Sequence, residues 1–267
     1  MMLFSGNISK MRSEYGQPVH YFLPVGDQEI AMNELIGQSV KFRFTGQINC
    51  IACGKKTKTS FSQGFCYSCL QTSPEASETV TRPELSKAHL GIARDMDWAR
   101  EHDLIEHVVY LALSSDLKVG VTRHHQVPTR WIDQGASFAI ELCRTPNRHI
   151  AGVIEVWLKK YFTDKTNWRA MLQNQIAANI DLSEEKKNAL QLLTPELQKY
   201  YSGNHKIWEF EYPAQRYPEK ITSITFDKTP EIAGILIGIK GQYLIFDDGS
   251  VINIRKHNGY WVEVTVE

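Results

Sequence analysis

The sequence predicts an α+β protein, and three observations lead to this fold class. Apolar and polar residues alternate in stretches of the first 48 residues, which is the period of a half-buried strand. The middle of the chain mixes two apolar strands with helical periodicity, and the last part is rich in β-branched and aromatic residues. A chain of 267 residues is long enough for two or three small domains. We expect three domains, over residues 1–82, 83–204 and 205–267.

The first domain is expected to be a β-sheet that carries a zinc ribbon. Segments 5–11, 18–25 and 38–46 show the strand period and are bounded by glycine or polar turns. Two CxxC pairs follow directly, and the polar segment 73–83 then serves as a connector to the next domain.

Four cysteines restrict the chemistry of this chain more than any other feature. Each CxxC pair places two thiolates on one tight turn, and the two pairs are separated by 12 residues, so together they can close a sulfur tetrahedron around Zn²⁺. The intervening GKKTKTSFSQGF suggests two short strands that cross back over the metal. Such a closed site is structural rather than catalytic. The ligands are Cys50, Cys53, Cys66 and Cys69.

The alternatives to zinc are a pair of disulfides or four unrelated free thiols. Disulfides require an oxidising compartment, and the N-terminus has no apolar run long enough for a signal peptide. No stretch approaches 18 apolar residues, so we expect no membrane span. These observations predict a cytoplasmic protein with a structural zinc ion.

The central domain is expected to be a three-stranded sheet with helices. Its apolar strands 107–113 and 117–122 are joined by a short turn, and Pro128 and Gly135 bracket a short helix. The expected elements, in order, are a helix over 84–102, the two strands of this hairpin, a helix over 128–134, a strand over 136–142, and helices over 147–161 and 168–201.

The C-terminal domain is expected to be a small barrel-like structure. Residues 206–267 contain short β-rich segments separated by turn signals such as Asp248-Gly249 and Asn258-Gly259.

Charge is concentrated in the middle of a chain whose formal net charge is zero. The segment from Lys118 to Arg169 contains nine basic residues and four acidic ones. A basic centre in a neutral chain suits an anionic ligand held at one site. The alternative is a solvated helical face without a ligand.

One ordered series of residues resembles the GIY-YIG nuclease superfamily. Val108-Val109-Tyr110 lies on one strand, Lys118-Val119-Gly120 on the next, Arg130 on the following helix and Glu155 on a later helix. The likeness is to the branch in which KIG replaces YIG. The first tripeptide lacks its glycine, and Lys118 stands where the second tyrosine is usual, so one group for proton transfer is missing.

This resemblance implies metal-dependent hydrolysis of a phosphodiester in DNA or RNA. Glu155 would hold Mg²⁺ or Mn²⁺, Arg130 would clamp the phosphate, and Tyr110 would accept a proton from water. Positive charge from Lys118 would favour the phenolate of Tyr110. The further phosphate or substrate contacts would be Gly120, Thr122, Arg123, His124 and Arg148.

Each of these residues also has an ordinary structural interpretation. Tyr110 in an apolar strand suits a core aromatic, and His124 suits a solvated loop. For Gly120, the resemblance implies that the backbone approaches the phosphodiester closely at this position. Arg130 with Asp133, and Glu155 with Lys159, have the spacing of surface helix pairs.

Over its whole length the chain is also similar to a bacterial family known only as a domain of unknown function. The matching phrases are the CxxC pairs, KVGVTR, RWIDQGA, TPNRHIAGVIE, GILIGIKGQYLIFDDG and NIRKHNGY. This likeness supplies no activity.

Three hypotheses about function follow. The first is a metal-dependent endonuclease. The second is a non-catalytic, zinc-containing DNA- or RNA-binding module that keeps a phosphate-docking surface, which a basic and aromatic ribbon tip would support. The third is a structural scaffold for a protein partner. The ribbon tip named in the second hypothesis consists of Lys55, Lys56, Lys58, Phe61 and Phe65.

Overall fold

The computed structural model describes residues 2–163 and 165–266 and divides the chain into two compact units. One unit combines the chain up to Gln71 with the chain from Phe210 onward, and the other spans Thr72–Glu209. This division differs from the three expected domains because the N-terminal and C-terminal segments form a unit together. The reason is strand pairing between the two segments.

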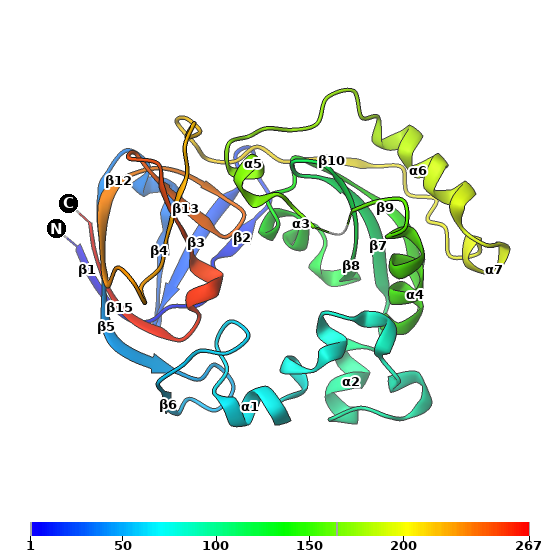
Figure 1. Ribbon diagram of the computed structural model, residues 1–267, viewed down its shortest axis with the longest axis horizontal. Coiled ribbons are helices and arrows are strands. Elements are labelled where there is room, and N and C mark those ends of the chain that lie inside the picture. Colours follow the sequence, from blue (N-terminus) through cyan, green and yellow to red (C-terminus); the bar gives the residue numbers. More distant parts are fainter. Residues whose placement is uncertain (1, 164, 267) are drawn as a thin grey trace. The chain divides into compact units, whose positions relative to one another are not determined.

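The main sheet of the first unit contains strands from both ends of the chain. β5 lies between β15 and β12 and is antiparallel to both. β1 pairs with β15, Met2 opposite Val266, so the two termini lie side by side (Figure 1). The order is β1 (Met2–Asn7), β15 (Tyr260–Val266), β5 (Ser39–Asn49), β12 (Glu231–Lys240), β13 (Tyr243–Phe246), β14 (Ser250–Asn253) and β11 (Thr222–Ile224).

This sheet is open among the described residues, because its pairing runs from β1 to β11 without returning. The barrel expected at the C-terminus is therefore not formed, and the C-terminal strands extend the N-terminal sheet instead. A separate sheet in the same unit contains β2 (Arg12–Glu14), β3 (His20–Val25) and β4 (Gln28–Ala31). The buried amide of Gln242 bonds both the backbone N–H and the carbonyl of Met11, at 2.7 and 3.0 Å, just before β2 begins.

The second unit is built on a four-stranded sheet in the order β10, β9, β7, β8. The three expected strands are present as β7 (His107–Leu113), β8 (Leu117–Arg123) and β9 (Phe138–Thr145), and β10 (Ile207–Glu209) is an added edge strand. Every residue of β7 is buried. Apolar side chains of α4 (Arg148–Leu158) and α6 (Leu182–Leu192) share one core with these strands, and Figure 1 shows α4 running beside the sheet.

Two of the expected helices are shorter than predicted. The helix expected over 84–102 is α2 (Met96–His102), which begins where the Asp95 carboxylate accepts a hydrogen bond from the backbone N–H of Trp98 at 2.9 Å. Gly91, with φ of +76°, ends a 3₁₀ turn just before it. The region expected over 168–201 contains α5 (Trp168–Leu172), α6 and α7 (Pro195–Gln198), because Asp181 and Pro195 each start a new helix.

The short helix expected over 128–134 is α3 (Thr129–Asp133). Of the helices in the described chain, none has the length and apolar character needed to cross a membrane.

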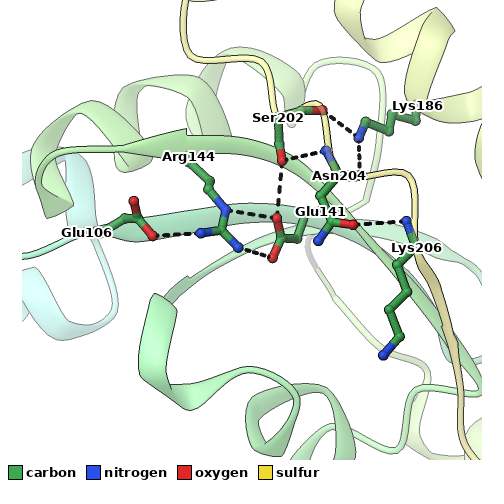
Figure 2. Close-up of polar contacts among 7 residues, drawn as sticks. All are labelled: Glu106, Glu141, Arg144, Lys186, Ser202, Asn204 and Lys206. Atoms are coloured by element: carbon green, nitrogen blue, oxygen red, sulfur yellow. Dashed lines mark hydrogen bonds and ion pairs between the residues drawn. The ribbon is translucent and has the colours of Figure 1, made fainter.

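A buried polar network fixes the segment that leads into β10 (Figure 2). The Glu141 carboxylate on β9 accepts hydrogen bonds from Arg144 and from the hydroxyl of Ser202. The ammonium group of Lys186 on α6 donates to the carbonyls of Ser202 and Asn204, at 2.7 and 2.6 Å. These bonds tie β9, α6 and the segment before β10 together.

Candidate functional site

The four cysteines of the first unit form one cluster. Their sulfur atoms all lie within 4.8 Å of one another. Sulfur ligands about 2.3 Å from zinc stand about 3.8 Å apart at the corners of a tetrahedron. The Cys53 and Cys66 sulfurs are 3.9 Å apart, and none of the five cysteines, all of which are described, forms a disulfide. The donors and their spacing therefore fit a Zn²⁺ ion.

The chain builds this cluster from the end of β5 and the start of α1 (Tyr67–Thr72). Gly54 has φ of +71° and donates its backbone N–H to the carbonyl of Cys50, which closes the first turn. Cys69 lies on α1 and points its backbone N–H toward the sulfur of Cys66 at 3.5 Å. In place of two strands crossing over the metal, the segment between the pairs has one short strand, β6 (Lys56–Thr57), paired with β5.

The surface of the ribbon mixes lysines with aromatic residues. Lys55, Lys56 and Lys58 are exposed. Phe65 is buried beside the cluster, whereas Phe61 makes an edge contact with the exposed ring of Tyr67.

The second unit contains a polar pocket of about 230 Å³. Tyr110, Lys118, Arg130 and Glu155 all line it, so the structure brings together the four residues predicted as catalytic. Cross-strand pairing places Tyr110 opposite Gly120, and Ala112 opposite Lys118, on the hairpin of β7 and β8. The other lining residues are Val80, Thr81, Pro83, Val119, Gly120, Val121, Gln134, Arg148 and Lys159.

Gln134 connects Tyr110 with Lys118. Its side-chain oxygen accepts a hydrogen bond from the Tyr110 hydroxyl at 2.8 Å and another from the Lys118 amine at 2.7 Å. The same amine donates to the hydroxyl of Thr166 at 2.8 Å. Both acceptors are neutral, and no carboxylate takes part in these bonds.

Burial changes the proton affinity of both groups. It lowers the pKa of Lys118 to about 7, with the nearby positive charge of Arg130 acting in the same direction. Burial also raises the pKa of Tyr110, and this outweighs the lowering effects of Arg130 and Gln134. The amine is therefore the group of this pair that loses its proton near neutral pH.

Gly120 provides the space that the Tyr110 ring occupies. A Cβ atom at this position would lie 2.6 Å from the Tyr110 hydroxyl oxygen and 2.7 Å from the adjacent ring carbon. The room next to the glycine was expected to admit a phosphodiester. It is filled by the phenol, although Gly120 still lines the pocket.

Charged residues give the pocket an excess of positive charge. Lys118, Arg130, Arg148 and Lys159 line it, and Glu155 is the acidic residue among the lining side chains. Glu155 is only 8% exposed, and its carboxylate lies 3.4 Å from the amine of Lys159. Arg148 uses its guanidinium to bond the carbonyls of Thr79 and Val80 and the carboxylate of Asp103.

Three predicted substrate contacts lie outside the lining of this pocket. Thr122 is buried, and its hydroxyl bonds the side chain of Gln126 at 3.3 Å. Arg123 ends β8, and His124 begins the 3₁₀ turn that follows. Conversely, the sequence interpretation did not include Gln134, Thr166 and Lys159. Gln134 stands four residues after Arg130, one helical turn away, which is the signal that could have identified it.

The sequence model of one family, described as protein of unknown function (DUF2797), matches residues 37–262. This match covers most of the chain. The chain belongs to this family. The similarity to a family of unknown function is thus confirmed, and the part of this DUF2797 protein that matches includes the four cysteines and every residue that lines the pocket. Searches of curated proteins and of solved structures gave no significant match.

Proposed function

We propose that this DUF2797 protein hydrolyses phosphodiester bonds in nucleic acid at the pocket of its second unit. The observation that carries the proposal is that Tyr110, Lys118, Arg130 and Glu155, which are distant in sequence, line one pocket. Their order along the chain also resembles that of the GIY-YIG nucleases.

The charge and size of the pocket support a phosphate ligand. Apart from Lys118, three basic side chains (Arg130, Arg148 and Lys159) and one carboxylate line it, which favours an anion. Its volume of about 230 Å³ lies below the range of about 300–1,000 Å³ that is usual for pockets enclosing whole small molecules. It therefore suits one phosphodiester group, with the rest of the substrate outside.

Lys118 is the best candidate for the general base, in place of Tyr110. The neutral amine gives its two hydrogens to Gln134 and Thr166, which leaves its lone pair to accept a proton from water. Its pKa of about 7 matches this role at neutral pH. The hydroxyl of Tyr110 gives its proton to Gln134 and has a raised pKa, so Tyr110 is better placed to hold Gln134 in position.

Arg130 is the better placed of the two pocket arginines to bind the phosphate. Two bonds from Arg148 hold the segment at Thr79 and Val80 against the start of α4 and a third reaches the carboxylate of Asp103, so most of its donors are occupied. A guanidinium can bind two phosphate oxygens at once and stabilise the charge that develops on them.

Glu155 fits a divalent cation only together with the substrate. Mg²⁺ commonly binds through one or two carboxylates, substrate phosphate and water, and Glu155 offers one carboxylate in the pocket. When bound, Mg²⁺ or Mn²⁺ would neutralise charge on the phosphate.

A cleavage assay tests this proposal. We expect the protein to cut labelled single- or double-stranded DNA or RNA with Mg²⁺ or Mn²⁺, and Glu155→Gln to reduce the rate about 100-fold or more. Glu184→Gln, at an exposed position on α6, should leave the rate unchanged. If no substrate is cut by the wild-type protein, the hydrolytic function is excluded.

The second candidate function is a non-catalytic DNA- or RNA-binding module, favoured by the exposed lysines and Tyr67 around the cysteine cluster. Wild type and Glu155→Gln that bind nucleic acid equally and cut nothing would support it. In either case we propose that zinc is structural. Metal analysis should then find about one zinc per chain under reducing conditions, and less than about half would contradict the site.

A further inference from the structure

The pocket is bordered by two segments of opposite charge. Val80, Thr81 and Pro83 contribute to its lining from one segment. Lys159 contributes from another, and the chain beyond it bonds β8, where the backbone N–H of Val119 donates to the carbonyl of Thr163 at 3.0 Å. Because the pocket has room for one phosphate group, a polymeric substrate must continue over one of these borders.

The border around Val80 repels a phosphate backbone. Residues 75–84 contain three glutamates and one arginine. The arginine, Arg82, already pairs with Glu78 at 2.7 Å and with Glu84 at 3.3 Å. Arg148 also bonds the carbonyls of Thr79 and Val80, so three glutamates stand against two arginines and this side keeps a formal charge of −1.

The border at Lys159 attracts a phosphate backbone. We call it the basic rim and define it as Lys159, Lys160, Tyr161 and Lys165. Lys160 and Lys165 are exposed, and the amine of Lys160 lies 4.2 Å from the centre of the Trp157 ring. The acidic residue Asp164 is also in this sequence, and it lies outside the described residues.

Tyr161 gives the basic rim an exposed aromatic ring. Its side chain is 54% exposed, and its backbone N–H donates a hydrogen bond to the carbonyl of Leu158, the last residue of α4. A ring exposed among lysines matches the way in which proteins bind unpaired strands, where bases stack on aromatic side chains and basic groups follow the backbone.

We propose that a single strand of nucleic acid leaves the pocket over the basic rim and that Tyr161 stacks on a base beside the phosphate held in the pocket. This inference rests on the proposed function, because it takes the pocket as the phosphate site. It adds the class of substrate, which is single-stranded or locally unpaired nucleic acid. A base within a duplex has no free face to offer Tyr161.

Binding of a fluorescent single-stranded oligonucleotide of about 12 nucleotides, within the usual site size, tests the role of Tyr161. With Mg²⁺ and Mn²⁺ left out to prevent cleavage, we expect Tyr161→Ala to weaken binding about 5- to 150-fold, and Tyr161→Phe to bind as wild type does. Leu90→Ala changes an apolar residue of the same unit that is 65% exposed, and it should have no effect. Equal affinity of Tyr161→Ala and wild type would overturn the inference, as would an equal loss for a matched duplex.

Salt dependence tests the charges of the basic rim. Lys165→Gln should reduce the slope of log affinity against log salt by about 0.7, the value for one contact to a single-stranded phosphate. Lys87→Gln, at an exposed position away from the pocket lining, should keep the wild-type slope. An unchanged slope for Lys165→Gln would count against the strand path.

Cleavage measured in parallel separates this inference from the proposed function. Cutting by the wild type, with normal binding by Tyr161→Ala, would reject the strand path and keep the hydrolytic function. Binding that depends on Tyr161, without any cutting, would reject hydrolysis and keep the strand path. Absence of both binding and cutting would reject the two proposals together.

Discussion

At the scale of single residues, the proposed chemistry of the pocket depends on an amine whose hydrogen bonds go to neutral groups. Lys118 is 4% exposed and its amine donates hydrogen bonds to an amide oxygen and a hydroxyl, so burial is not offset by an ion pair and the pKa falls to about 7. An acidic neighbour would reverse this effect, since it favours the ammonium form.

The first prediction follows from the protonation of Lys118. The base must be neutral, so the cleavage rate should rise with pH through about 7 and level off above it. Lys118→Met should lower the rate about 10²- to 10⁴-fold at pH 8. Gln134→Glu should shift the rise to higher pH, because a carboxylate beside the amine raises the pKa of Lys118. A pH–rate profile that is identical in Gln134→Glu and wild type would contradict the assignment of Lys118 as base.

The second prediction concerns Gly120. An alanine Cβ would meet the Tyr110 hydroxyl at 2.6 Å, so Gly120→Ala should displace the ring and cost about 1–3 kcal/mol of unfolding free energy. Cleavage should fall as well, because Tyr110 would lose its bond to Gln134. Gly203→Ala is the control, since a Cβ there meets nothing within 4 Å. Denaturant unfolding with equal midpoints for the two variants would show that the ring can move at no cost.

Most ionisable residues of the pocket, Lys159 excepted, could be predicted from the sequence, but the division of proposed roles among them could not. Tyr110, Lys118, Arg130 and Glu155 stand in a recognisable order on predicted strands and helices. Which of Tyr110 and Lys118 loses a proton near pH 7 depends on burial and on the neutral oxygens of Gln134 and Thr166. An amide carries no charge and Thr166 is far along the chain, so neither stands out in a sequence.

At the scale of secondary structure, the polar network of Figure 2 adds hydrogen bonds between β9, α6 and the segment before β10. β10 has three residues, and the segment before it reaches β9 through a bond from the backbone N–H of Ser202 to the carbonyl of Leu142 at 2.9 Å. Lys186 is 1% exposed and supplies two further bonds to this segment.

The third prediction concerns this network. Lys186→Ala leaves the buried carbonyl of Ser202 without its side-chain donor, so the unfolding free energy should fall by about 1–3 kcal/mol. Amide hydrogen exchange should become faster in β10 before it does in β7, whose residues are all buried. Lys187→Ala, at an exposed position on the same helix, should change stability by less than about 0.5 kcal/mol. A similar loss of unfolding free energy in both variants would mean that the hydrogen bonds of Lys186 make no specific contribution to stability.

Elements with local signals could be predicted well, and elements that depend on distant contacts could not. The hairpin of β7 and β8 has continuous apolar strands and a short turn, and it forms where expected. The first half of the helix expected over 84–102 is not α-helical. Gly91 ends a 3₁₀ turn there, and the α-helix begins only after its N-cap residue, Asp95. β10 has only three residues, and their pairing with β9 decides their conformation. No local sequence pattern therefore predicts this strand.

At the scale of the whole molecule, the first unit depends on strands that are far apart in sequence. β5 has β12 on one side and β15 on the other. The alternation of apolar and polar residues along a strand does not indicate which distant strand it pairs with. No local sequence pattern could therefore indicate that the N-terminal and C-terminal segments form one unit rather than separate domains.

The fourth prediction tests this shared sheet. A chain that ends at Glu209 keeps the second unit and loses β11 to β15. The amides of β5 should then exchange rapidly with solvent, whereas those of β7 should stay protected as in the full-length protein. Hydrogen exchange followed by mass spectrometry measures both strands in one sample. Protection of β5 in the shortened chain would show that the N-terminal segment folds by itself.

The position of β5 has a consequence for synthesis on the ribosome. β5 ends at Asn49 and β12 begins at Glu231, so about 180 residues are translated between the two neighbours. At about 5–20 residues per second, β5 waits roughly 10–40 s with unpaired backbone edges. The second unit, which is continuous in sequence, can complete its own sheet during that interval. We therefore expect the second unit to fold first, and the main sheet of the first unit to form only after β12 and β15 have been synthesised.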